Sequence, residues 1–197
     1  SSSVYGAAKK FPISETDPTD RPLSLYAATK VAGEAMLSAF SHTHGLRATA
    51  FRFFNAYGHW ARPDSALFIF TQRILSGRPI EVFDHGNAMR DFTFVGDIVE
   101  GIASADRQTG GFQIFNLGNS HPVRLRDFIS ALEGVLGKKA ERNYLPARPE
   151  DIPRSHADIG KAKNLLGFRP AVDFKKGIAE FILWYRQYED KLDLRNL

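Results

Sequence analysis

The chain has 197 residues, of which 43% are hydrophobic and 24% are charged, and its formal net charge is +4. This composition is ordinary for a soluble globular protein with one sizeable core. The absence of cysteine excludes disulfides and thiolate zinc sites and fits a reducing cytoplasm. No apolar run approaches the roughly 18 residues that a membrane-spanning helix needs. We therefore expect a cytoplasmic protein that does not contact membranes.

The charged residues argue against two further classes of partner. Lysines and arginines are scattered among acidic residues, without the basic stripe with interleaved aromatics that is typical of nucleic-acid binding. The six histidines show no metal-ligand spacing with carboxylates. We therefore expect no nucleic-acid partner and no metal site, whereas the positive net charge would suit an anionic substrate.

The first elements expected along the chain are a loop, a helix and a strand. Residues 9–24 are rich in Pro, Asp, Ser and Thr, which predicts a loop across the surface. The pattern then predicts a helix over residues 25–44, ended by Gly45. Residues 47–54 alternate in character and are rich in β-formers, which predicts a strand buried in a parallel sheet.

The rest of the chain alternates between short strands and helices. Asp64 is expected to cap a helix that ends at Gly77, and Asp97 is a cap candidate for the helix after it. Strands that alternate with helices indicate an α/β fold. The strands are predicted at residues 79–83, 90–95, 113–117 and 140–145, and the helices at 64–76, 96–105, 123–136, 159–166 and 174–188.

Tyr26 and Lys30 are the most informative residues of the sequence. They stand four residues apart at the start of a predicted helix and so lie on one face. A lysine ammonium favours the phenolate form of a neighbouring tyrosine, and a phenolate can take a proton from a sugar hydroxyl. The spacing alone would equally suit a tyrosine in the core beside a solvated lysine. Two surrounding segments favour a catalytic role for the pair. They are Ser-Ser-Ser-Val-Tyr-Gly at residues 1–6 and Arg-Phe-Phe-Asn-Ala-Tyr-Gly at residues 52–58.

Together these segments resemble the extended short-chain dehydrogenase/reductase family, the NAD-dependent nucleotide-sugar epimerases and dehydratases. The resemblance runs from residue 1 to about residue 188. It implies that Tyr26 is the general base and acid and that Lys30 activates it and binds the nicotinamide ribose. It also implies that Ser1 hydrogen-bonds the reacting sugar hydroxyl, although a serine at a chain end is usually disordered.

Members of that family begin with a glycine-rich turn that binds the pyrophosphate of NAD at a helix N-terminus. This sequence contains no such turn. We therefore expect the C-terminal portion of a Rossmann-type enzyme of α/β class. A remnant of the NAD-binding domain is expected at residues 1–58, and a smaller α/β domain, mainly for binding the nucleotide-sugar, at residues 59–197.

The resemblance also implies contacts with the substrate. Asn55 and Arg90 match positions that contact the nucleotide diphosphate. Arg148 matches a phosphate-binding arginine and Asp151 a ribose-binding aspartate, in a run where Glu150 replaces the usual glycine. Read without the resemblance, Asn55 would be a turn residue at a strand end, and the arginines would be solvated surface charges.

The best indication of the sugar is the run Trp-Ala-Arg-Pro-Asp-Ser-Ala-Leu-Phe at residues 60–68. It resembles a segment of UDP-glucuronate 4-epimerases, which implies that Arg62 pairs with the hexuronate carboxylate through two parallel hydrogen bonds. The alternative is an arginine that braces its own loop. Ala61 and Ser65 replace a glycine and a methionine of that segment, so another UDP-sugar remains an alternative substrate.

Other activities remain as alternatives. The 4,6-dehydratases carry an Asp-Glu pair where this chain has Ser2 and Ser3, which cannot do acid/base work near neutral pH. The decarboxylases lack the run at residues 60–68. A catalytically inactive fragment that retains a UDP-sugar binding surface is the remaining alternative. A homodimer, or association through an exposed sheet edge, is expected because an unpaired strand invites pairing.

Overall fold

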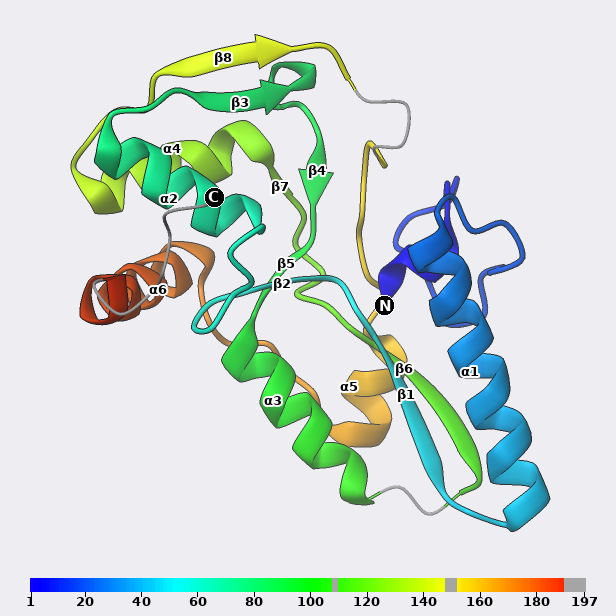
Figure 1. Cartoon of the computed structure of the whole chain (residues 1–197). Coiled ribbons are helices and arrows are strands. Elements are labelled where there is room, and N and C mark those ends of the chain that lie inside the picture. Colours follow the sequence, from blue (N-terminus) through cyan, green and yellow to red (C-terminus); the bar gives the residue numbers. More distant parts are fainter. Residues whose placement is uncertain (108–109, 148–151, 190–197) are drawn as a thin grey trace.

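A computed structural model describes residues 1–107, 110–147 and 152–189, except for the side chain of Arg107. The helices and strands form two groups joined by short strand pairs (Figure 1). In this part of the chain no helix is long and apolar enough to cross a membrane. The strands are β1 (Ala48–Phe53), β2 (Asn55–Tyr57), β3 (Ile80–Phe83), β4 (Met89–Arg90), β5 (Phe92–Phe94), β6 (Phe112–Leu117), β7 (Val123–Arg124) and β8 (Arg142–Leu145). The helices are α1 (Leu25–His44), α2 (Ala66–Ser76), α3 (Val95–Ser104), α4 (Leu125–Leu136), α5 (Gly160–Leu166) and α6 (Phe174–Tyr188), with short 3-10 helices η1 (Ser2–Tyr5), η2 (Asp84–Gly86) and η3 (Ala105–Arg107).

The first group is built around the parallel pair of β1 and β6, which confirms the strand predicted at residues 47–54. Strand residues point alternately to opposite faces. Phe51 and Phe53 therefore share the face that packs with Phe115 against α3 and α5. Arg52, between them, is buried on the opposite face, where its guanidinium reaches α1. The two faces of this strand pair thus hold one apolar layer and one polar layer.

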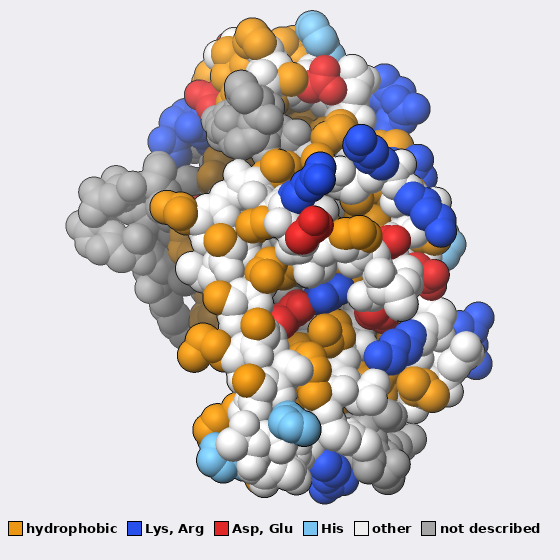
Figure 2. Space-filling view, turned by 90° about the vertical axis from the view of Figure 1, so that its right-hand side faces the viewer, with side chains coloured by type: hydrophobic (Ala, Val, Ile, Leu, Met, Phe, Trp, Pro, Cys, Tyr) orange, Lys and Arg blue, Asp and Glu red, His pale blue; other side chains and the backbone are white. Residues whose placement is uncertain are grey.

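Helix α1 has the bounds expected from the sequence. The Ser24 hydroxyl accepts a hydrogen bond from the Ala27 amide at its start, and Gly45 ends it with a left-handed φ of 64°. Ala27 and Ser41 are the buried residues among its 20 positions. On the face that Figure 2 presents, hydrophobic side chains are exposed along the molecule, and Met36 and Phe40 are among the exposed apolar residues of this helix.

The second group places β3 and β8 over α2 and α4, with α6 beyond them (Figure 1). Its core is aromatic, and Phe68, Phe128 and Phe181 are fully buried in it. At Gly177 an added Cβ would collide with the hydroxyl of Tyr57, so a glycine is required where α6 crosses this ring. The strand that ends in Tyr57 is thereby held directly against α6.

Three local predictions were wrong. Ser65, not Asp64, caps α2, because its hydroxyl accepts from the Phe68 amide while the Asp64 carboxylate pairs with Arg62. The predicted strand over residues 90–95 is two strands, because β4 pairs antiparallel with β7 and β5 pairs parallel with β2.

The third correction concerns Asp97, which does not cap α3. It is buried, and its two carboxylate oxygens accept from the backbone amides of Ala171 and Val172 at 3.1 and 3.2 Å. Asp97 therefore has the local sequence context of a helix cap, but it makes long-range hydrogen bonds that fix the segment before α6. The domain boundary at residue 58 stays a prediction, and β1 on one side of it pairs with β6 on the other.

Candidate functional site

Tyr26 and Lys30 lie side by side in the first turns of α1. The Lys30 ammonium nitrogen is 5.2 Å from the centroid of the Tyr26 ring, which confirms that the two side chains share one face. Both are exposed, and Tyr26 keeps 54% of its surface accessible. Both side chains are therefore accessible to a ligand.

Ser1 lies near this pair, next to the N-terminal half of α1. Its nitrogen donates to the Phe51 carbonyl at 3.2 Å, and its hydroxyl is 2.8 Å from that of Ser3. The 3-10 helix η1, which follows Ser1 directly, contacts α1. Ser1 is thus placed against the helix that carries Tyr26 and Lys30.

The direction of α1 brings Tyr26 to the same end of the sheet as Asn55. The helix runs antiparallel to β1 and connects to it through a short loop, so its start lies at the carboxyl end of that strand (Figure 1). Asn55 follows β1 at this end. Ligands of open α/β sheets bind outside the carboxyl ends of the strands. The candidate site is therefore at the expected edge.

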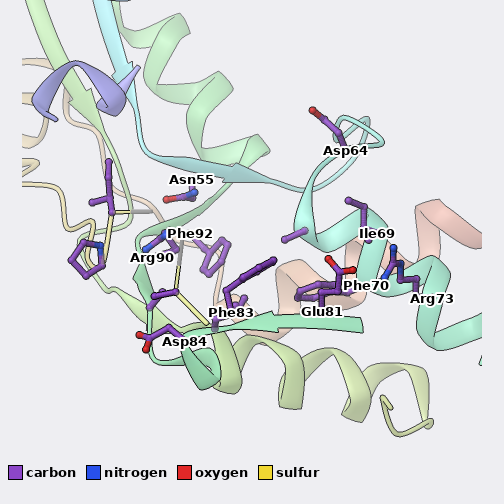
Figure 3. Close-up of a pocket in the computed structure, with 16 residues that line it drawn as sticks. Asn55, Asp64, Ile69, Phe70, Arg73, Glu81, Phe83, Asp84, Arg90 and Phe92 are labelled. Carbon is purple, nitrogen blue, oxygen red and sulfur yellow. The ribbon is translucent and has the colours of Figure 1, made fainter. Parts of the chain in front are cut away.

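A cavity of about 390 Å³ extends from this edge into the second group of elements. Figure 3 shows Asn55 and Arg90 next to each other at one end of it and Arg73 at the other. The rings of Phe83 and Phe92 lie between these polar ends. An apolar wall between sparse polar groups is the usual form of a small-molecule site.

The orientation of Asn55 is fixed by its neighbours. Its Oδ1 accepts a hydrogen bond from the Ser155 hydroxyl at 3.1 Å, and that hydroxyl accepts one from the Asp91 amide at 3.1 Å. The Asn55 amide in turn donates to the Asp91 carbonyl at 2.9 Å. With its oxygen held in this way, Asn55 presents its NH₂ group as a donor toward the cavity.

Asp91 organises the backbone behind the cavity. Its buried carboxylate accepts from the amides of Asn119, Ser120 and Ala157 at 2.7, 3.1 and 2.8 Å. Burial raises the pKa of this carboxyl, although the three amides oppose that effect. Asp91 therefore joins the loop after β6 to the segment that carries Ser155.

The predicted arginines differ in their placement. Arg90 lines the cavity from β4, where its guanidinium donates to the Met89 carbonyl at 3.1 Å. Arg62 does not line the cavity. Its side chain is 79% exposed and its Nε lies 3.2 Å from the Asp64 carboxylate, which does line it. Arg62 thus stands on the loop at the rim.

Arg148 and Asp151 lie outside the described residues. The residues on either side of this segment, Ala147 and Ile152, both line the cavity. The roles of Arg148 and Asp151 stay predictions.

The sequence reasoning missed several cavity residues on β3 and η2. Glu81 and Phe83 line the cavity, while Ile80 and Val82, which alternate with them along β3, are buried. This alternation could have been read from the strand predicted at residues 79–83. Asp84, also in the wall, has a left-handed φ of 48°, an uncommon conformation for a residue other than glycine.

Residues 1–118, more than half of the chain, match the NAD dependent epimerase/dehydratase family. The chain belongs to this family. UDP-glucuronate 4-epimerase 2 of Arabidopsis thaliana is 44% identical over 205 residues, which is 95% of this chain and 47% of the plant protein. An uncharacterized protein of Methanocaldococcus jannaschii is 44% identical over 192 residues, 98% of this chain and 59% of that protein.

Solved structures of the epimerase family share the fold. The UDP-glucuronic acid 4-epimerase from Bacillus cereus in complex with UDP-glucuronic acid and NAD is 31% identical, with a TM-score of 0.88 over 95% of this chain and 60% of that chain. MoeE5 in complex with UDP-glucuronic acid and NAD is 34% identical with a TM-score of 0.88, and the match covers 63% of its chain. This chain therefore spans about half to three fifths of the length of its relatives.

Proposed function

We propose that the protein acts as an NAD-dependent 4-epimerase that interconverts UDP-glucuronate and UDP-galacturonate. The observation that carries this proposal is the Tyr26–Lys30 pair, exposed at the same end of β1 as Asn55, which lines a cavity together with Arg90. The similarity to UDP-glucuronate 4-epimerases supports the choice of sugar. A cytoplasmic location is part of the same proposal, since a sequence without cysteine suits a reducing compartment.

Tyr26 takes the proton of the sugar 4-hydroxyl in this proposal. The ammonium of Lys30, 5.2 Å from the Tyr26 ring, stabilises the phenolate that does this. Ser1 hydrogen-bonds the same hydroxyl and helps to relay its proton. The reaction is reversible. Tyr26 and Ser1 therefore also return the proton to the 4-oxygen of the sugar that has the opposite configuration at carbon 4.

The described residues fit one end of NAD. The exposed Lys30 has three N–H donors for the hydroxyls of the nicotinamide ribose, and Tyr26 lies on the same face. When bound, NAD would supply reversible hydride transfer at carbon 4 of the sugar.

The cavity would bind the UDP part of the substrate. The Asn55 NH₂ group and the Arg90 guanidinium suit phosphate oxygens, one as a neutral donor and the other as a planar cation. The apolar wall that includes Phe83 and Phe92 suits the uracil ring. Anchoring this remote part would supply binding energy and leave the sugar ring free to turn.

Arg62 would select the uronate. It stands on the exposed loop at the rim, where pairing with Asp64 leaves 79% of its side chain accessible. A guanidinium can bind a carboxylate through two parallel hydrogen bonds. MoeE5 has been solved with UDP-glucose as well as with UDP-glucuronic acid, so related sites bind both sugars. In this protein Arg62 would favour UDP-glucuronate over UDP-glucose.

The proposal is tested by incubating the full-length gene product with NAD and UDP-glucuronate and following UDP-galacturonate by proton NMR. Product at an equilibrium ratio reached from either sugar supports it. No product from either uronate, with UDP-sugar binding still detectable, would favour a protein that binds UDP-sugars without converting them. A 4-keto-6-deoxy product from a neutral UDP-sugar would instead indicate a dehydratase, against the serines at positions 2 and 3.

A further inference from the structure

The face of β1 that points toward α1 carries one buried charge, Arg52, with 4% of its side chain exposed. It meets Glu34 of α1 in a two-pronged contact. Nε and Nη2 of Arg52 donate to the two carboxylate oxygens of Glu34 at 2.9 and 2.7 Å. Parallel bonds of this kind fix direction as well as distance.

Arg52 is itself held from other sides. Its Nη1 donates to the Glu15 carbonyl at 3.1 Å, and its guanidinium carbon lies 4.7 Å from the centroid of the Tyr5 ring. The Tyr5 hydroxyl donates to Asn116 at 2.6 Å on β6. The fork that receives Glu34 is therefore a rigid part of the sheet rather than a mobile surface arginine.

Glu34 shares its side of the helix with the catalytic pair. Tyr26, Lys30 and Glu34 follow one another at intervals of four residues, so they form one stripe along α1. A rotation of α1 about its axis that moved Glu34 would swing Tyr26 and Lys30 by a similar angle. The contact with Arg52 thus acts two turns from the phenol.

Apolar contacts of this helix are few within the described part of the chain. Ala27 and Ser41, near its two ends, are its buried residues, and apolar side chains are exposed along its outer side (Figure 2). In its middle, Val31 is partly buried against the cluster that includes Val4 and Tyr5. Such a contact is non-directional, whereas the two parallel hydrogen bonds of the Arg52–Glu34 pair fix an orientation.

We propose that Glu34, held by Arg52, is a positioning residue that sets the rotation of α1 and so aims Tyr26 and Lys30. The catalytic consequence rests on the proposed epimerase function, whereas the aiming itself does not. Glu34 is a better test position than Arg52, because Arg52 also contacts Glu15 and Tyr5.

The test compares Glu34→Gln with Glu133→Gln. Glu133 is an equally suitable buried carboxylate far from α1, where Arg142 and Lys139 bind its two oxygens at 2.8 and 2.9 Å. Glu34→Gln keeps the shape of the side chain but removes its charge, which weakens the two hydrogen bonds from Arg52. Glu133→Gln controls for the loss of stability that follows the loss of any buried ion pair.

Two readouts are taken from the full-length gene product. The first is steady-state epimerisation, for which Glu34→Gln should lower kcat about tenfold and leave the KM for the UDP-sugar unchanged. Glu133→Gln should leave both unchanged. The second is the fluorine NMR signal of 3-fluorotyrosine placed at position 26. It should shift or split in Glu34→Gln and keep its wild-type position in Glu133→Gln.

The outcomes separate the two claims. A wild-type protein that epimerises no UDP-sugar overturns the proposed function, and the fluorine signal still decides the positioning. A fluorine signal at position 26 that is the same in wild type and Glu34→Gln overturns the positioning. So does a fall in melting temperature with kcat intact, which would make the ion pair merely structural. Recovery of kcat in Glu34→Asp, which restores the charge, would support the proposal.

Discussion

The Ser155 hydroxyl donates a hydrogen bond to Oδ1 of Asn55 across 3.1 Å, which joins two residues 100 positions apart. Because the oxygen of the amide is occupied, its nitrogen is the end presented to the cavity. Asn55 is therefore oriented as a neutral donor before any ligand arrives. Preorganisation of this kind lowers the ordering cost of binding.

Replacing Asn55 by aspartate tests this orientation. Asn55→Asp puts a negative charge where the diphosphate is proposed to lie, so we expect the affinity for UDP to fall about 10- to 100-fold, or about 1.4–2.8 kcal/mol. Titration calorimetry with UDP measures it. Asn143→Asp makes the same charge change on an exposed residue of β8 and should leave the affinity unchanged. Equal effects in the two variants would contradict a diphosphate contact.

Arg62 is expected to discriminate between sugars. Arg62→Ala should raise the KM for UDP-glucuronate by about 10- to 100-fold, since a hydrogen bond to a charged group contributes about 1.5–3 kcal/mol. The KM for UDP-glucose should not change. Arg21→Ala, which removes another exposed arginine paired with a neighbouring aspartate, is the control. Parallel changes for both sugars would show that Arg62 braces its loop instead.

Asp91 is expected to stabilise the segment behind Asn55. Asp91→Asn replaces an acceptor oxygen by an NH₂ group that faces backbone amides, so at least one buried amide loses its partner. We expect the free energy of unfolding in urea to fall by about 1–3 kcal/mol. The exposed Asp20→Asn change should have no such effect. An unchanged urea midpoint for Asp91→Asn would show that the three hydrogen bonds contribute little.

Glu133 gives the protein a defined dependence on acid. Burial alone would raise the pKa of Glu133, but hydrogen bonds from Arg142, Lys139 and the Ala140 amide outweigh it and lower this pKa to about 2. The model-peptide value is 4.5, so the charged form favours folding. This stability is complete above about pH 4.5 and is lost as the pH falls toward 2.

Melting temperatures measured against pH test this dependence. Glu133→Gln should melt below wild type at pH 7, and the gap should narrow between pH 4.5 and 2. Glu141→Gln, an exposed neighbour, should follow the wild-type curve. A gap that is constant with pH would mean that the ionised form of Glu133 has no preferred partner.

Short-range patterns predicted the elements well. Gly45 and Gly77 end their helices in left-handed conformations as expected, because glycine adopts that conformation without strain. The side-by-side placement of Tyr26 and Lys30 followed from helix geometry alone. Long-range bonds were beyond such patterns. Asp97 has the local context of a cap but binds backbone amides 74 and 75 residues away.

The candidate site was predicted in part. The resemblance named Asn55 and Arg90, and both line the cavity. It could not show that Ser155 turns the Asn55 amide or that Asp91 supports Ser155, because those contacts depend on how distant segments pack. Nor could it place Glu34 against Arg52, a contact between a helix and the strand that follows it.

The most direct test of the account follows the hydrogen on carbon 4 of the sugar. The full-length gene product is given UDP-glucuronate deuterated at carbon 4, with NAD, in ordinary water. We expect UDP-galacturonate that keeps the deuterium at carbon 4, and a Tyr26→Phe variant that is slowed at least 100-fold while it still binds UDP. Product that has exchanged the deuterium for a solvent proton, or normal turnover by Tyr26→Phe, would contradict it.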